Sequence, residues 1–130
     1  MLRKISVVAL LLAASPCQAK YGAGAASIVH HGSHWYVSVG TARNFDTPSG
    51  AEQKALQECS ETSHGGECTV TMHFSNGGCG YMVSGTAGSE SGHVCWGQGS
   101  TPSIATQQCN SRGCDCTDTP IGGCADEDGE

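Results

Sequence analysis

The sequence predicts a small α+β domain stabilised by disulfides, in which antiparallel strands carry two short helices. Eight of the nine cysteines follow Thr47, and an even set of cysteines in a small domain is typical of a disulfide framework. Leu56 is the only leucine after residue 19, so the chain has little apolar area to bury and depends on cross-links. Two stretches also share one pattern, which indicates an imperfect internal duplication.

The N-terminus has the pattern of a secretory signal peptide over residues 1–19. Arg3 and Lys4 precede an uncharged apolar run, Ile5 to Ala14, which small residues follow. We expect cleavage after Ala19, which would discard Cys17 and leave eight cysteines for four bridges. Lipidation of Cys17 is the alternative, although a proline directly before it does not suit a lipoprotein signal. The product is therefore expected to be periplasmic or extracellular.

The remaining chain is expected to form one domain, residues 20–124, built from two related units at about 26–83 and 93–124. No segment after the signal is long and apolar enough to span a membrane. The acidic tail, 125–130, is expected to be a solvated end of the chain.

Charge narrows the class of partner. Without Arg3 and Lys4, 4 basic side chains remain against 12 acidic ones, a net charge near −8 with neutral histidines. Nucleic acid and anionic membranes would be repelled, whereas a basic protein would be attracted.

The repeated pattern predicts the helices. "TPSGAEQKALQEC" (Thr47 to Cys59) and "TPSIATQQC" (Thr101 to Cys109) both begin Thr-Pro-Ser and end Ala-x-Gln-x-Cys. Threonine suits an N-cap and proline the first helical position, which predicts helices over Pro48–Cys59 and Pro102–Cys109. The residues expected on the buried face of the first helix are Ala51, Ala55, Leu56 and Cys59.

The strands are predicted from alternation and turn residues. "SIVHHGSHWYVSV" (Ser27 to Val39) reads as a hairpin about Gly32-Ser33, with Trp35, Val37 and Val39 on one face. The stretch Cys68 to Val83 places Val70, Met72 and Phe74 on one face, turns at Asn76-Gly77-Gly78 and returns through Tyr81 and Val83. Ser84 to Gly92 is expected to be a flexible loop or hairpin tip.

The repeat also narrows the disulfide pairing. If both copies share one bridge, Cys59–Cys68 and Cys109–Cys116 each join a helix end to the strand that follows. Four cysteines then remain, with three possible pairings: Cys79, Cys95, Cys114 and Cys124. Proximity in the sequence favours Cys79–Cys95 and Cys114–Cys124.

The stretch Ala51 to Val83 resembles the family known as domain of unknown function 4189. Ten positions match its pattern of a helix end, a Gly-x-Cys-x-Val strand, an aromatic residue and an Asn before Cys-Gly: Ala55, Leu56, Cys59, Gly66, Cys68, Val70, Phe74, Asn76, Cys79 and Gly80. The resemblance extends over about Tyr21 to Cys116, with one extra glycine before Cys79 and a shorter second helix. It implies a small exported bacterial protein and supplies no reaction or catalytic residues.

The "HHGSH" stretch contains the densest group of reactive side chains. In a two-residue hairpin turn His31 and His34 lie opposite each other on one face, while His30 lies with Trp35 on the other. Two imidazoles need a third ligand to hold a metal, and His73 is the candidate for it. Polar side chains on a solvated hairpin are the plainer interpretation.

Catalytic patterns are missing from the sequence. No Gly-x-Ser-x-Gly or phosphate-binding loop occurs, and all eight retained cysteines are expected in bridges. The acidic side chains Glu52, Glu58, Glu61 and Glu67 are expected to be solvated rather than paired in a cleft. We therefore expect no enzyme activity and no cofactor.

Binding to another protein is then the leading hypothesis, as an inhibitor of a cell-wall hydrolase or an immunity protein against a toxin. A basic partner would suit the charge of this chain. The alternatives are a secreted factor that acts on a host or on the envelope, and a histidine-based metal-binding protein. The residues nominated for contact lie at the hairpin tip and in the 84–92 loop: His31, Gly32, His34, Trp35 and Glu90. The oligomeric state is left open.

Overall fold

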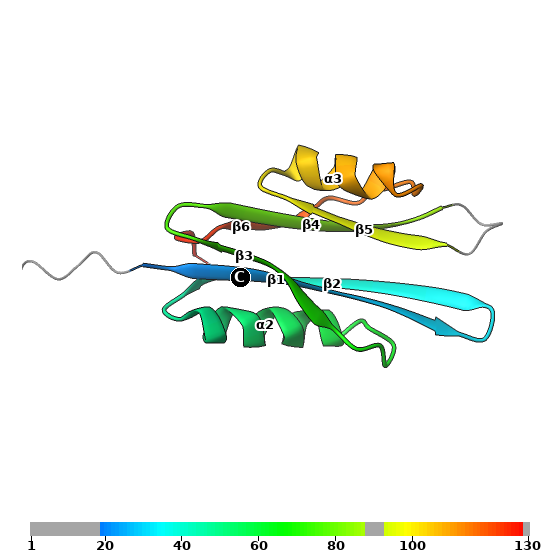
Figure 1. Cartoon of the computed structure of the whole chain (residues 1–130), viewed down its shortest axis with the longest axis horizontal. Coiled ribbons are helices and arrows are strands. Elements are labelled where there is room, and N and C mark those ends of the chain that lie inside the picture. Colours follow the sequence, from blue (N-terminus) through cyan, green and yellow to red (C-terminus); the bar gives the residue numbers. More distant parts are fainter. Residues whose placement is uncertain (1–18, 88–92, 129–130) are drawn as a thin grey trace, which may run out of the picture.

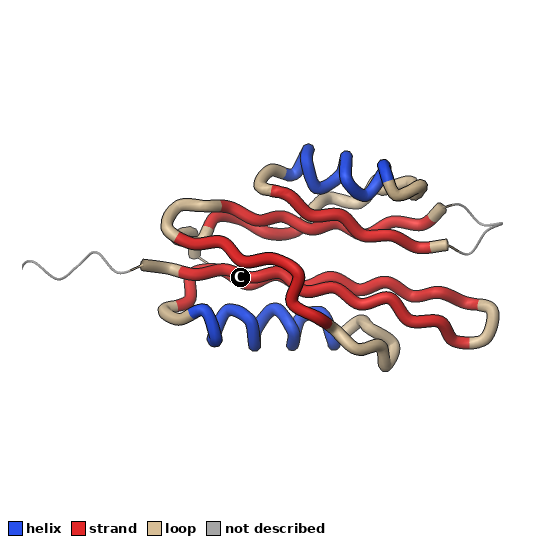
Figure 2. Tube along the Cα trace, in the orientation of Figure 1, coloured by secondary structure: helices blue, strands red, loops and turns tan. Residues whose placement is uncertain are grey.

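The computed structural model describes residues 19–87 and 93–128 of the chain. Its elements form four layers, with a helix outside each of two stacked three-stranded sheets (Figures 1 and 2). The α+β prediction is confirmed. The expected signal peptide, including Cys17, lies outside the described residues apart from Ala19 at its end.

The first unit forms one sheet and one helix. It contains β1 (Tyr21–His31), β2 (His34–Phe45), α2 (Pro48–Ser60) and β3 (Thr69–Ser75). The strand order is β2-β1-β3, with both pairings antiparallel.

The second unit repeats this arrangement. It contains β4 (Cys79–Thr86), β5 (Val94–Gly99), α3 (Pro102–Ser111) and β6 (Ile121–Cys124). Its strand order, β5-β4-β6, is that of the first unit, so each unit is a hairpin, a helix and a final strand that pairs with the first strand. The internal duplication extends from sequence pattern to topology.

The boundary between the units differs from the predicted one. β3 and β4 follow each other in the sequence but belong to different sheets, so β4 starts the second unit. The predicted first unit, residues 26–83, wrongly included β4 as its last strand. The predicted return through Tyr81 and Val83 is therefore not a hairpin partner of β3. The connecting turn contains Asn76 and Gly77 at φ 51° and 83°, a left-handed backbone that turns the chain from one sheet to the other.

Both predicted helices are present and begin as expected. The Thr47 side chain accepts a hydrogen bond from the Gly50 N–H at 3.0 Å, and Thr101 accepts from Ile104 at 3.1 Å. Each threonine has extended backbone and a proline follows it, which is the geometry of an N-cap.

The core under each helix consists of small side chains. Ala23, Ala25, Ala51, Ala55 and Cys59 are fully buried in the first unit. Leu56, predicted on the buried face, is only partly buried and packs at the margin of this cluster. The apolar face of α2 is therefore narrower than predicted.

One glycine in each unit allows the helix to lie directly on its sheet. A Cβ at Gly40 would lie 2.5 Å from the Ala55 carbonyl oxygen, and one at Gly97 would lie 2.3 Å from that of Ala105. These contacts are equivalent in the two copies, because Ala55 and Ala105 both lie four residues before the helix cysteine. Gly40 and Gly97 set the spacing between helix and sheet.

Methionine and phenylalanine side chains lie in the space between the two sheets. Met82 is fully buried there, beside Gly24, and Met72 and Phe74 of β3 point toward Gly80 of β4. The predicted common face of Met72 and Phe74 is therefore correct.

All eight predicted cysteines form disulfides, with two of the four pairings as expected. Cys59–Cys68 and Cys109–Cys116 join each helix end to the chain that follows. The other two predicted pairings are wrong, because the bridges are Cys79–Cys124 and Cys95–Cys114.

Strand register explains the error. Cys124 lies directly opposite Cys79, on β6. Cys95 instead pairs with Gly85, at the other end of β4, about 20 Å from Cys79 at the usual rise per strand residue.

The backbone of the acidic tail folds back onto β2 as far as Asp128, while residues 126–128 themselves are exposed to solvent. The Asn44 N–H donates to the Ala125 carbonyl oxygen at 2.8 Å, and the Arg43 Nε donates to that of Asp128 at 3.1 Å. Ala125 is fully buried. Hydrogen bonding to the end of β2 therefore fixes the tail.

Replacing Gly40 or Gly97 with alanine should destabilise the domain by about 1–3 kcal/mol, because the new methyl group would overlap helix backbone. The measurement is the melting temperature of each oxidised variant. Gly50→Ala is the control, since the nearest neighbours of its Cβ would be side-chain atoms, the Phe45 ring at 3.1 Å and the Thr47 hydroxyl at 3.2 Å, and it should shift the melting temperature much less. Equal shifts in all three variants would contradict the close helix approach.

Removal of the Cys79–Cys124 bridge should cost more stability than removal of Cys109–Cys116. The loops closed have sequence separations of 45 and 7, which corresponds to about 4 and about 2.5 kcal/mol by loop entropy. Chemical denaturation of the two double-serine variants tests this order. A larger loss for the shorter loop would show that this bridge acts mainly through the native state.

Candidate functional site

The β1–β2 hairpin extends past the rest of its sheet. Pairing between β1 and β3 ends at Ala26 and Thr69, so residues 27–38 form a two-stranded ribbon at the right of Figure 1. Gly32, at φ 62°, occupies the first position of the two-residue turn, as a type II′ hairpin requires. The predicted hairpin and its turn are confirmed.

One face of the ribbon contacts the loop after α2. His31 and His34 lie opposite each other, as predicted, with the Tyr36 ring on the same face. The His31 Nε2 donates to the His64 carbonyl oxygen at 2.8 Å, and the His64 ring stacks on Tyr36 at 4.0 Å between centroids. The loop therefore supports the hairpin tip from this side.

The other face presents apolar surface to solvent. The rings of His30 and Trp35 stack at 4.3 Å with 11° between their planes. Trp35 and Ile28 remain 43% and 45% exposed, and they are two of the four large apolar side chains that are exposed in the described part of the chain. The nominated Trp35 is thus accessible, whereas the nominated Glu90 lies outside the described residues.

The three histidines nominated as metal ligands do not come together. His73 lies on β3 opposite Ala23, far along β1 from His31, and donates to a Glu52 carboxylate oxygen at 2.6 Å. Within residues 19–87 and 93–128, one trio of potential ligands lies close together: His93, Cys95 and Cys114. The disulfide between its two cysteines occupies both sulfur atoms.

A groove of about 810 Å³ follows the outer edge of β2, and the sequence did not reveal it. Seven consecutive residues, Val39 to Phe45, line it. Since neighbouring strand residues point to opposite faces, the floor of the groove is the backbone edge of the strand. Residues of α2 and its C-terminal loop form one side and residues of the β6 segment the other: Lys54, Glu58, Thr62, Pro120, Ile121 and Gly122.

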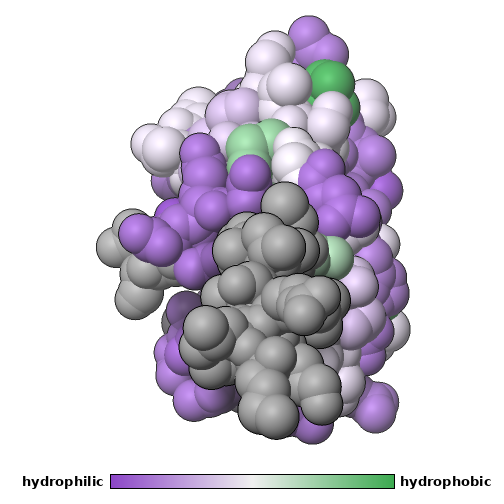
Figure 3. All heavy atoms as spheres, turned by 90° about the vertical axis from the view of Figure 1, so that its left-hand side faces the viewer, coloured by the Kyte–Doolittle hydropathy of each residue, from purple (hydrophilic) through white to green (hydrophobic). Residues whose placement is uncertain are grey.

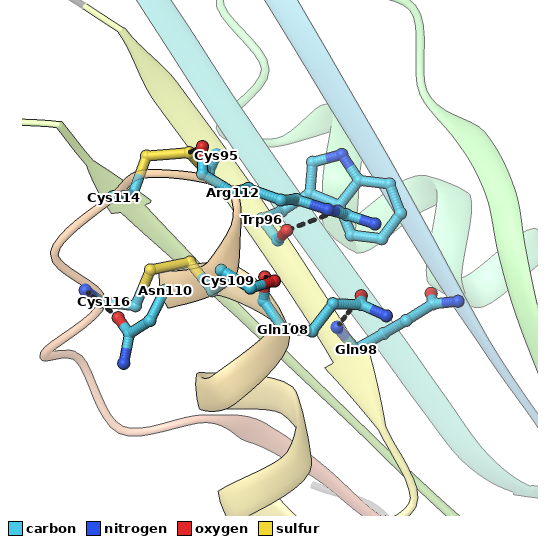
Figure 4. Close-up of a disulfide and its surroundings, with 10 residues drawn as sticks. Cys95, Trp96, Gln98, Gln108, Cys109, Asn110, Arg112, Cys114 and Cys116 are labelled. Carbon is cyan, nitrogen blue, oxygen red and sulfur yellow. Dashed lines mark hydrogen bonds between the residues drawn. A yellow bond between two sulfur atoms is a disulfide. The ribbon is translucent and has the colours of Figure 1, made fainter.

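The corresponding edge of the second unit is closed by side chains. Arg112 donates to the Trp96 carbonyl oxygen and lies over the Trp96 ring at 4.5 Å, and the Gln98 N–H donates to the Gln108 side chain at 2.9 Å (Figure 4). Both capping side chains come from α3 or its C-cap. The two units therefore differ in how this edge is treated.

Comparison with known families gives one match. The model of the family described as domain of unknown function (DUF4189) matches residues 21–120. The chain belongs to the DUF4189 family. No curated protein and no solved structure matches the chain.

The DUF4189 match covers the first ββαβ unit and the second as far as the segment after α3, and it ends directly before β6. Among the described residues, no helix is both long and apolar enough to span a membrane.

Removing the His31 side chain should loosen the hairpin tip, because its hydrogen bond to the α2–β3 loop is lost. We expect His31→Ala to speed amide exchange at the tip by up to about fivefold, equivalent to about 1 kcal/mol for one hydrogen bond. His34→Ala is the matched control, since His34 lies opposite on the same face. Equal effects of both variants would contradict a specific role of the His31 contact.

Proposed function

We propose that this DUF4189 protein is an exported, non-catalytic protein-binding module that inhibits a basic cell-wall hydrolase or toxin. The observation that carries the proposal is the ribbon at residues 27–38, which extends beyond β3 and exposes Trp35 at its tip. Exposed aromatic side chains on rigid scaffolds are typical anchors of protein interfaces.

The scaffold suits an inhibitor because disulfides cross-link both of its units. Disulfides join elements in each unit, and the α2–β3 loop supports the tip through His31 and Tyr36. A binding loop that is already ordered loses little conformational entropy when a partner binds.

Charge favours a basic partner. The chain has 12 acidic and 6 basic side chains, and two of the basic ones lie in the expected signal peptide. The coloured surface at the opposite end of the molecule from the tip is mostly hydrophilic, with small apolar patches (Figure 3). Long-range attraction would bring a basic hydrolase close, and the apolar tip would supply the anchor.

Export is part of the proposal. Four disulfides need an oxidising compartment, and the pattern of residues 1–19 supplies a route to it. The periplasm and the cell exterior both fit.

The test is affinity capture of envelope and secreted proteins on the oxidised chain, followed by an activity assay of the retained hydrolase or toxin. Trp35→Ala should weaken binding by about 2 kcal/mol, roughly 30-fold in Kd, if Trp35 is an anchor. Ile104→Ala is the matched control, because Ile104 is exposed to a similar extent, 45% against 43% for Trp35, but lies on α3.

Two outcomes would overturn the proposal. One is that the folded, oxidised chain retains no hydrolase or toxin. The other is that retained enzymes keep full activity at saturating concentrations of the chain, which would favour a secreted factor that acts on a host or on the envelope.

A further inference from the structure

We propose that the open edge of β2, at Val39 and Thr41, binds an extended segment of a partner protein as an additional strand. The inference rests on the proposed protein-binding function and names the surface and the binding mode. The bound segment would extend the β2-β1-β3 sheet, with its backbone hydrogen-bonded to β2.

The second unit shows which backbone groups such a strand would use. Gly40 and Gly97 make the same contacts to their helices, so Val39 corresponds to Trp96 and Thr41 to Gln98. The Trp96 carbonyl and the Gln98 N–H point away from the sheet, because side chains outside it bond them. The carbonyl of Val39 and the N–H of Thr41 therefore point outward too.

The geometry of the β1–β2 hairpin independently shows that these backbone groups point outward. His31 and His34 flank a two-residue turn and form a hydrogen-bonded pair. Alternation along the strand then directs the N–H and C=O of Val37, Val39 and Thr41 away from β1. These groups form a regular row along the edge, and two of the three residues, Val39 and Thr41, line the groove.

The first unit lacks the caps of the second. Counted from the helix cysteine, Glu58 corresponds to Gln108 and Thr62 to Arg112. The Glu58 carboxylate lies 3.7 Å from Lys54, and the Thr62 hydroxyl lies 2.6 Å from that of Ser38. Both positions line the groove instead of closing it.

One backbone group on this edge of β2 already makes a hydrogen bond of the kind that pairs strands. The Asn44 N–H donates to the Ala125 carbonyl oxygen at 2.8 Å, so the chain's own C-terminal segment occupies the end of the edge beyond the bulge at β2. A partner strand would continue this interface toward Val37.

The two sides of the groove define the chemistry of the bound segment. Side chains on one face of the added strand would meet Pro120 and Ile121, which is 43% exposed, and those on the other face would meet Lys54, Glu58 and Thr62. The occupant is therefore a segment in which apolar and polar residues alternate. A volume of about 810 Å³ lies in the range of preformed sites, roughly 300–1,000 Å³.

Charged side chains at an edge commonly prevent strand addition. Here Lys54 pairs with Glu58 across one turn of α2, and Arg43 donates to the Gly122 carbonyl oxygen at 2.6 Å. Both cations lie at the sides of the groove with partners of their own, and the bulge lies beyond Ala42, so the row from Val37 to Thr41 stays regular.

The test uses the purified, oxidised chain and a displayed library of seven-residue segments with alternating apolar and polar residues. Selected peptides are synthesised in three forms: unmodified, and N-methylated at each of the two alternating sets of backbone amides. Methylation of the set that faces β2 should weaken binding at least tenfold, whereas methylation of the other set should change it less than twofold. If the chain recognised only the side chains of the peptide, methylation of either set of backbone amides would have the same effect on binding.

A protein variant tests the same surface. Glu58→Gln with Thr62→Arg transfers the caps of the second unit to the first and should weaken peptide binding at least tenfold. Gln57→Arg with Glu61→Gln is the matched control, because it makes the same change of charge on and just after α2 at positions that do not line the groove. Melting temperatures show whether each variant is folded.

Three results would overturn the inference: no selected peptide with Kd below 1 mM, equal effects of the two methylated sets, or unchanged binding by the folded, capped variant. A concentration-dependent dimer that only the capped variant abolishes would also overturn it, in favour of pairing with a second copy of the chain. Capture of a hydrolase that the capped variant retains equally well would leave the proposed function in place and remove the groove as its binding site.

Discussion

The close approach of each helix to its sheet is the constraint on which the rest of this fold depends. At Gly40 and Gly97 no side chain separates the strand from the helix backbone, and the core beside them is alanine and cysteine with one valine, Val83. Such small side chains bury little apolar area, so the core alone would stabilise the domain weakly. The same approach brings Cys59 within 6.2 Å of Cys68 between Cα atoms, and Cys109 within 6.1 Å of Cys116. The glycine contact and the disulfide therefore act together in each unit.

Features that depend on neighbouring residues could be predicted from the sequence. Thr-Pro-Ser starts both helices, and the Gly32 turn fixes the pairing of His31 with His34. The two repeated disulfides also span short separations. The sheet to which β4 belongs and the Cys79–Cys124 bridge depend on pairing with β6, far along the chain, for which no local pattern exists. The docking of the tail on Arg43 and Asn44 is equally remote in sequence.

The candidate site also combines features that the local sequence predicts with features that depend on distant parts of the chain. The stacking of His30 on Trp35 follows from the register of one hairpin, which the turn sets. Only its residue type makes His73 a candidate ligand in the sequence, and its strand places it at the opposite end of β1, beside Glu52. The groove unites β2, α2 and residues 120–122, which only the folded chain brings together. Residue patterns could indicate β2 and α2, but neither β6 nor the space between these elements.

Comparison of the two units within one chain identifies what the scaffold itself does not require. Both copies keep the helix cap, the close glycine contact and the helix-end disulfide, so these features belong to the ββαβ fold. They differ in the length of the hairpin and in the treatment of its outer edge. β2 has 12 residues and β5 has 6, and α3 and its C-cap close the edge of β5 through Gln108 and Arg112. Since the fold tolerates a short, capped edge in the second unit, stability does not explain the long, open edge in the first. Trp35, Val39 and Thr41 all lie on that one strand, so the exposed tip and the groove that we propose for a partner both belong to the part in which the first unit differs from the second.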